Sequence, residues 1–148
     1  MRRLIAFILA PAVLSGFSNY LPFHAPECQP SAESRLLVGT WYGKFELDGD
    51  QIEFIDRRSP DQTYFLENRS TSSGEEKIDV ENGRWRICQG KFWTLPDNRR
   101  EAEFDYFVYD VISVEKDKFV YRDNGLEVTF TAVRVPDNFQ FPAVTPNP

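Results

Sequence analysis

Short runs of alternating apolar and polar residues, separated by turn signals, fill residues 39–135. The clearest run is 126–134, where Val128, Phe130 and Ala132 alternate with Thr129 and Thr131. Such alternation predicts strands that bury one face. No run here has the periodicity of a helix, so the region predicts an all-β domain of about eight antiparallel strands. We favour an up-and-down barrel over a sandwich because a closed barrel leaves no strand edge unpaired.

Turn signals set the limits of the expected strands. Asn82-Gly83 is the strongest hairpin signal, and we expect a turn there between a weak strand and the strand that contains Trp85. Residues 68–74 are polar and predict a loop. The run 101–115 is longer than a typical strand, so we expect a bulge near Tyr109-Asp110. The runs with a strand pattern are 39–47, 51–56, 63–68, 84–88, 91–95, 101–115, 119–122 and 126–134, with a weaker one at 77–80.

Residues 1–18 have the features of a secretory signal peptide. Met1-Arg2-Arg3 is followed by an apolar run, 4–14, and then by small residues. We expect cleavage after Ser18, although Ser15 also fits. The apolar run has about 11 residues, whereas a spanning helix needs about 20, so stable membrane insertion is not expected. The sequence predicts an exported protein, periplasmic or secreted, with an uncleaved anchor or a buried helix as the alternative.

The charge of the chain narrows the classes of partner. The formal net charge is −6, and removal of Arg2 and Arg3 with the signal peptide leaves −8. Nucleic acids and anionic membrane surfaces attract basic proteins, so we expect neither as a partner. The acidic residues are spread along the chain, which favours solubility.

Proline-rich segments flank the expected barrel, which we place at 36–135. Residues 19–35 predict an extended arm, and residues 136–148 predict a loose tail, because neither has apolar periodicity. Cys28 lies in the arm and Cys88 at the end of an expected strand. An even number of cysteines in an exported protein predicts a disulfide, worth about 4 kcal/mol for a loop of this length. Two free thiols are the alternative.

The opening of the first strand, Gly39-Thr40-Trp41, resembles the Gly-x-Trp signature of lipocalin-like (calycin) barrels of the small exported bacterial type. The resemblance covers roughly residues 37–135. It implies that Trp41 packs across the closed end of the barrel and that Arg134 stacks on it. Strand geometry supports this pairing, because the first and last strands of such a barrel are antiparallel neighbours and Arg134 shares the face of Phe130.

Two subfamilies can be compared with the same stretch. The residues GTWY are similar to the avidin opening, but Lys44-Phe45-Glu46 stands where avidins place polar biotin ligands, so we do not expect biotin. The stretch PSAESRLLVGTW is similar to the arm and first strand of small bacterial lipocalin-like protease inhibitors. The wide spacing of the two cysteines departs from that pattern.

Aromatic residues are concentrated on the expected strands and are candidates to line a ligand cavity. An eight-stranded barrel is close to the size at which side chains fill the interior, so the same residues can fill it instead. The sequence predicts binding of a small apolar or amphipathic molecule, with a protein-interaction module acting through the arm as the alternative. The candidate ligand-binding residues are Phe45, Phe54, Trp85, Phe104, Tyr106, Tyr121 and Phe130.

Residues for catalysis are few. The single histidine, His24, lies in the arm, and no cluster has the spacing of a metal site or of a nucleophile with its base. We therefore expect no enzyme, no metal and no cofactor. Asp110 shares the parity of Phe104 and Tyr106, so it either sits in a pocket with a raised pKa or is turned outward by the expected bulge.

Overall fold

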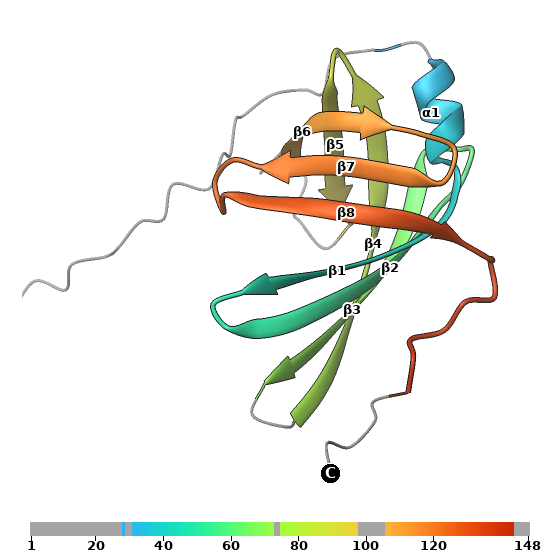
Figure 1. The fold of residues 1–148 in the computed structure, drawn as a ribbon. Coiled ribbons are helices and arrows are strands. Elements are labelled where there is room, and N and C mark those ends of the chain that lie inside the picture. Colours follow the sequence, from blue (N-terminus) through green and yellow to red (C-terminus); the bar gives the residue numbers. More distant parts are fainter. Residues whose placement is uncertain (1–27, 29–30, 73–74, 98–105, 144–148) are drawn as a thin grey trace, which may run out of the picture.

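Eight antiparallel strands close into a barrel in which each strand pairs with the next and the last returns to the first (Figure 1). The computed structural model describes residues 28, 31–72, 75–97 and 106–143. This architecture confirms the predicted up-and-down barrel. The elements are α1 (Ala32–Leu37), β1 (Gly39–Leu47), β2 (Asp50–Arg58), β3 (Thr63–Ser72), β4 (Glu75–Cys88), β5 (Lys91–Pro96), β6 (Phe107–Val114), β7 (Lys118–Asp123) and β8 (Val128–Val135).

Two of the predicted hairpins have the backbone that their sequences favour. Asp48 and Gly49 join β1 to β2 with φ of 52° and 87°. Gln89 and Gly90 join β4 to β5 with φ of 51° and 72°. Positive φ at both central residues matches the right-handed twist of the flanking strands, which is why such turns close hairpins.

The turn predicted at Asn82-Gly83 is wrong. β4 runs straight through these residues, and β3 continues to Ser72 through the predicted loop, so the two strands form a long ribbon (Figure 1). A Cβ at Gly83 would lie 2.3 Å from the carbonyl oxygen of Leu95 and 2.7 Å from the ring of Tyr64. The glycine therefore permits a close approach inside a strand rather than a turn.

The position predicted for Tyr106, inside the barrel, is also wrong. Tyr109 and Val111 pack against the core, whereas Asp110 lies on the outer face. Tyr106, at the start of this segment, lies 6.0 Å from the ring of Trp93 on the outside of the barrel. The register shift falls between Val111 and Ser113, slightly beyond the position expected. Aromatic residues occur at both parities here, so periodicity alone cannot select the buried face.

A short helix replaces the last part of the predicted extended arm. In α1, Ser31 accepts a hydrogen bond from the amide of Ser34 at 3.1 Å, and the Ser34 hydroxyl accepts one from the amide of Ser31. This reciprocal cap stabilises a helix of six residues that has no periodicity long enough to predict. Leu37, its last residue, is fully buried. The rest of the predicted arm, apart from Cys28, lies outside the described residues.

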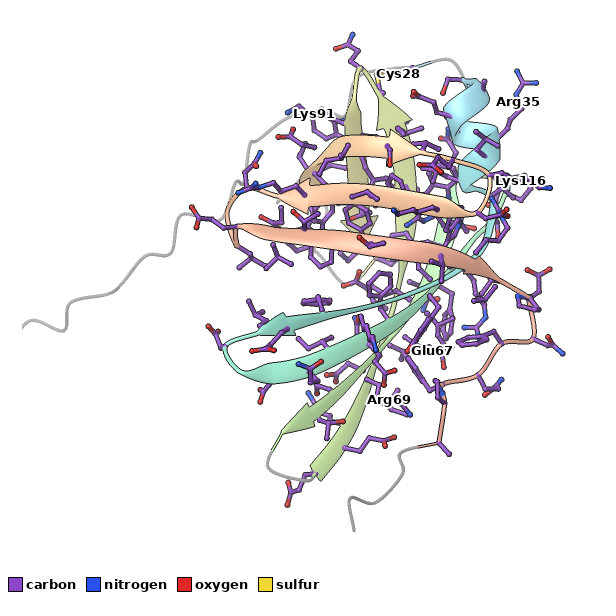
Figure 2. All side chains as sticks on the ribbon, viewed as in Figure 1. Cys28, Arg35, Glu67, Arg69, Lys91 and Lys116 are labelled. Atoms are coloured by element: carbon purple, nitrogen blue, oxygen red, sulfur yellow. A yellow bond between two sulfur atoms is a disulfide. The ribbon has the colours of Figure 1, made fainter. Side chains whose placement is uncertain are left out.

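The tail, predicted to be loose, packs along the outside of β1, β2 and β3 as far as Pro142 (Figure 1). Asp137 accepts a hydrogen bond from Thr40 at 2.9 Å, and the ring of Phe139 lies 5.0 Å from that of Tyr42. Arg69 donates to the carbonyl oxygen of Pro142 at 2.7 Å. Figure 2 shows Arg69 on the side of the strands along which the tail runs. Individual side chains and carbonyl oxygens make these contacts, and the tail has no alternation of apolar and polar residues. The pattern of the sequence therefore does not predict them.

Candidate binding site

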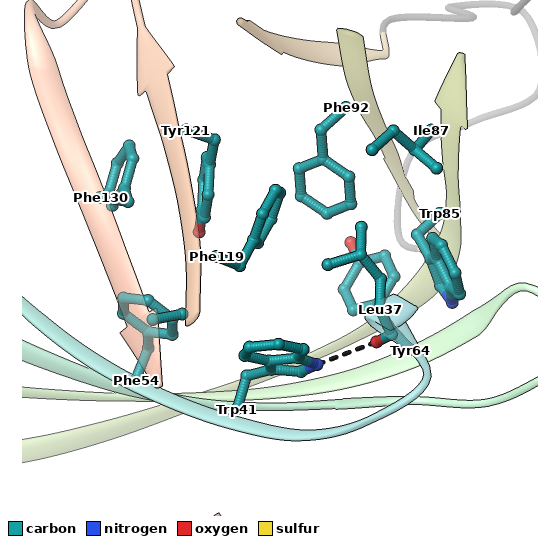
Figure 3. Close-up of a cluster of buried hydrophobic side chains, with 11 residues drawn as sticks. Leu37, Trp41, Phe54, Tyr64, Trp85, Ile87, Phe92, Phe119, Tyr121 and Phe130 are labelled. Atoms are coloured by element: carbon teal, nitrogen blue, oxygen red, sulfur yellow. Dashed lines mark hydrogen bonds between the residues drawn. The ribbon is translucent and has the colours of Figure 1, made fainter. Parts of the chain in front are cut away.

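One end of the barrel is closed by Trp41, as predicted. Its side chain is fully buried, and its indole nitrogen donates to the carbonyl oxygen of Leu37 at 2.9 Å (Figure 3). The guanidinium of Arg134 lies 4.4 Å from the centre of the Trp41 ring. Arg134 also donates to the carbonyl oxygens of Val38, at 2.8 Å, and of Lys116, at 2.7 Å. The arginine thus joins the last strand to the segment that leads into the first.

The glycine of the Gly-x-Trp signature has a specific role here. Gly39 has a φ of 123°, a conformation that residues with a side chain rarely adopt. A Cβ at this position would lie 2.4 Å from Nη1 of Arg134. Gly39 therefore leaves the space in which Arg134 reaches Trp41.

A layer of apolar side chains packs against Trp41 and fills the closed end. Leu37, Phe119 and Ile87 are almost completely buried, and Phe119 meets the indole edge to face at 6.3 Å (Figure 3). Trp85 also belongs to this cluster and donates its indole N–H to the carbonyl oxygen of Thr63 at 3.0 Å. Trp85, predicted to bind ligand, is thus placed in the packing of the closed end.

Beyond this layer the barrel holds a cavity of about 110 Å³, partly open to solvent. A buried water needs roughly 10–15 Å³ by the same measure, so the interior has room for a small organic molecule. Four predicted residues line the cavity: Phe45, Phe54, Tyr121 and Phe130. Tyr106 lies on the outer face and Phe104 outside the described residues. The other lining residues are Asp56, Tyr64, Leu66, Asn68, Glu81, Phe92 and Thr94.

The aromatic wall of the cavity is a network of ring contacts. Tyr121 and Phe130 stack at 4.9 Å with an interplanar angle of 17°. Phe45 meets Phe130 at 4.8 Å, close to perpendicular. The ladder between β1 and β8 ends at the pair Gly43 and Ala132, so Phe45 lies where the two strands no longer pair. Because each of these rings packs against a neighbouring ring, the wall has a defined shape.

A buried ion pair on β2 lies in the interior beside this wall. Nε of Arg58 donates to Oδ2 of Asp56 at 2.8 Å, and Nη2 of Arg58 lies 2.6 Å from the same oxygen. The guanidinium of Arg58 packs over the rings of Phe92 and Phe119, at 4.5 and 5.0 Å from their centres. Sequence reasoning missed this pair because the predicted strand 51–56 stops short of Arg58, whereas β2 includes it. The alternation of the strand could have predicted it, because Asp56 and Arg58 lie two and four residues after Phe54 and therefore on the same inward face.

Two carboxylates face the cavity. Oδ1 of Asp56 is buried and has no hydrogen-bond partner among the described residues. Burial raises the pKa of Asp56, although Arg58 acts to lower it. Glu81 accepts a hydrogen bond from the hydroxyl of Tyr64 at 2.5 Å. Burial, together with this hydrogen bond, raises the pKa of Tyr64. The cavity therefore combines apolar walls with acceptor groups.

Asp110 adopts the outward alternative. Its carboxylate pairs with Lys91 and accepts a hydrogen bond from the side-chain amide of Asn124. These two contacts lower the pKa of Asp110, so the alternative with a raised pKa is wrong.

Among the described residues, no group of three or more histidine, cysteine, aspartate or glutamate side chains is placed to hold a metal ion. No helix in the described part of the chain is long and apolar enough to cross a membrane.

The predicted disulfide is present. Cys28 and Cys88 are bonded, with Cα atoms 6.0 Å apart, and the bond ties the segment before α1 to the end of β4. Disulfides persist in oxidising compartments, in agreement with export.

Comparison with known proteins does not assign the chain to a family. No protein-family model matches the chain, and no curated protein matches its sequence.

Proposed function

We propose that this protein is an exported, lipocalin-like binding protein that holds a small apolar or amphipathic molecule inside its barrel. The observation that carries the proposal is the cavity of about 110 Å³ with walls of Phe45, Phe54, Tyr121 and Phe130. Binding sites for small molecules combine apolar walls with a few polar groups that orient the ligand. The volume is well below the roughly 300–1,000 Å³ of sites for drug-sized ligands, so the ligand has few heavy atoms.

Several features support the lipocalin-like and exported parts of the proposal. Gly39, Trp41 and Arg134 form the arrangement that the lipocalin resemblance implies. The apolar run that follows Met1-Arg2-Arg3 and the disulfide both fit an exported protein.

Native mass spectrometry of protein purified from its exporting host tests the proposal. We expect a copurified small molecule that is released when the protein is denatured. Protein without any bound molecule, together with no saturable response to added 1-butanol, would contradict the proposal.

One observation favours a second candidate function, interaction with another protein. Ile78 and Val80 are 52% and 63% exposed on the outer face of β4, in the ribbon that β3 and β4 form. Neighbouring exposed apolar side chains are typical of interaction surfaces. Loss of partner capture in an Ile78→Ser, Val80→Ser double variant that keeps its barrel would support this function, and unchanged capture would contradict it.

A further inference from the structure

We infer that the cavity takes a small organic cation, a protonated alkylamine of a few carbon atoms. Its charged end lies near Asp56 and Glu81, and its alkyl part lies against the aromatic wall. The inference rests on the proposed function and names the ligand class.

The charge of the lining residues favours a cation. Among the described residues that line the cavity, Asp56 and Glu81 are acidic and none is basic. Arg58 pairs with Asp56 but is not part of the lining. The formal charges of these two carboxylates and of Arg58 add up to one net negative charge, which a monovalent cation would neutralise.

The free oxygen of Asp56 requires a donor. Asp56 is 7% exposed, and its Oδ2 is already used by Arg58. Its Oδ1 is buried without a partner beside the cavity. A buried acceptor without a hydrogen bond is unfavourable, so a ligand N–H that reaches Oδ1 would gain more here than at a hydrated carboxylate.

The aromatic wall suits the same ligand. A cation is attracted to the face of an aromatic ring within about 6 Å of its centre. The protein already makes this contact in its interior, because the guanidinium of Arg58 lies 4.5 Å from the centre of Phe92. Phe92, Tyr121 and Phe130 also line the cavity.

An anionic ligand fits the interior less well. Nη1 of Arg58 has no hydrogen-bond partner among the described residues, but the guanidinium packs over Phe92 and Phe119 and stays outside the lining. An anion in the cavity would face Asp56 and Glu81 before it reached Arg58.

Three probes of similar size separate the effect of charge from that of the apolar cavity. The ¹⁵N-labelled protein is titrated at pH 7 with n-butylammonium, 1-butanol and butyrate, and the affinities are read from chemical shifts. We expect n-butylammonium to bind about tenfold more tightly than 1-butanol, with butyrate weakest. Equal affinity for the cation and the alcohol, or tighter binding of butyrate, would overturn the inference but leave the proposed function standing. No binding of any probe would contradict the proposed function itself.

Three variants then test which carboxylates cause the preference for the cation over the alcohol. Asp56→Asn and Glu81→Gln are expected to lose most of the about tenfold preference for the cation while they keep their affinity for 1-butanol. Asp79→Asn is the matched control, because Asp79 lies on the same strand as Glu81, does not line the cavity and has a side chain that is 60% exposed.

Asp56→Asn leaves Arg58 unpaired and can fail to fold. In that case the comparison of Glu81→Gln with Asp79→Asn shows whether a carboxylate of the cavity produces the preference for the cation. An equal loss of preference in these two variants, or no loss in Glu81→Gln, would overturn the inference.

Discussion

The guanidinium of Arg134 lies 4.4 Å from the centre of the Trp41 ring, so the last strand of the barrel covers the plug supplied by the first. The same arginine donates to the carbonyl oxygen of Val38, just before β1 begins. The closed end is therefore held by one stacked pair and by hydrogen bonds from the last strand to the segment before the first. The cavity lies beyond this layer, so stability and ligand binding are separable.

Trp41→Ala is expected to lower the free energy of unfolding by roughly 3–5 kcal/mol, because it leaves a large void among buried side chains. Urea unfolding measures the loss, and titration with 1-butanol measures what happens at the cavity. We expect the affinity for 1-butanol to change little in the folded variant. A loss of stability well below this range would show that Trp41 is not the plug of the barrel.

Gly39→Ala is expected to destabilise the protein more than Gly49→Ala. Both glycines have positive φ, 123° and 87°, but a Cβ at Gly39 meets Arg134 whereas a Cβ at Gly49 meets no atom within 4 Å. We expect the difference in the free energy of unfolding to exceed about 1 kcal/mol. In an Arg134→Ala background the difference should shrink, because the clash is gone. A difference that persists there would assign the effect to backbone strain at Gly39 alone.

Acid is expected to loosen the tail through Glu53. Burial acts to raise the pKa of Glu53, but hydrogen bonds from Tyr42 and Arg69 dominate and hold it below its ordinary value of 4.5. This contribution to stability is fully present above about pH 4.5 and is lost as the pH falls through the lower folded pKa. Arg69 also holds Pro142 and stacks on Phe141, so the tail should respond first.

The amide signals of the tail, followed from pH 7 to pH 3, measure this response. In Glu53→Gln we expect the acid-dependent change in the tail to be largely absent. The same pH dependence in both proteins would show that another group controls the tail.

Reduction of the disulfide is expected to leave a folded barrel with lower stability. The bond closes a loop between residues 60 positions apart, which the chain-entropy model values at about 4 kcal/mol. Leu37 stays buried in the closed end, so we expect protease cleavage to accelerate before Ser31 and not within α1. Limited digestion with and without reductant measures this, and equal rates of cleavage before Ser31 would contradict the tether.

The closed end was predictable because two kinds of information agree there. The Gly-x-Trp resemblance selects Trp41, and the parity of the last strand places Arg134 on the inner face. The neighbour order of a meander then brings both together. Phe45, Phe54 and Phe130 were placed by the same alternation, because each lies on a strand whose inner face is the more apolar one.

Other features were not predictable because local signals compete with pairing. Asn82-Gly83 has the composition of a turn, but the pairing of β4 with both neighbours overrides it. The sequence from Phe104 to Tyr109 carries aromatic residues at both parities, so periodicity could not select the buried face. Asp56 and Arg58 share the parity of Phe54, but charged residues at a strand end are also the composition of a turn, so the alternation was not extended to them, and the structure shows both buried.

The most direct test of the central claim is an NMR titration of a variant with a filled cavity. Leu66→Trp places a large ring in the cavity lining, and Phe65→Trp is its control, because Phe65 is 37% exposed and does not line the cavity. For the wild type and the control we predict saturable shifts with 1-butanol that centre on Phe54, Phe92 and Tyr121. Leu66→Trp should stay folded and lose them. Equal binding by the two variants, or shifts confined to the outer face, would contradict a ligand site inside the barrel.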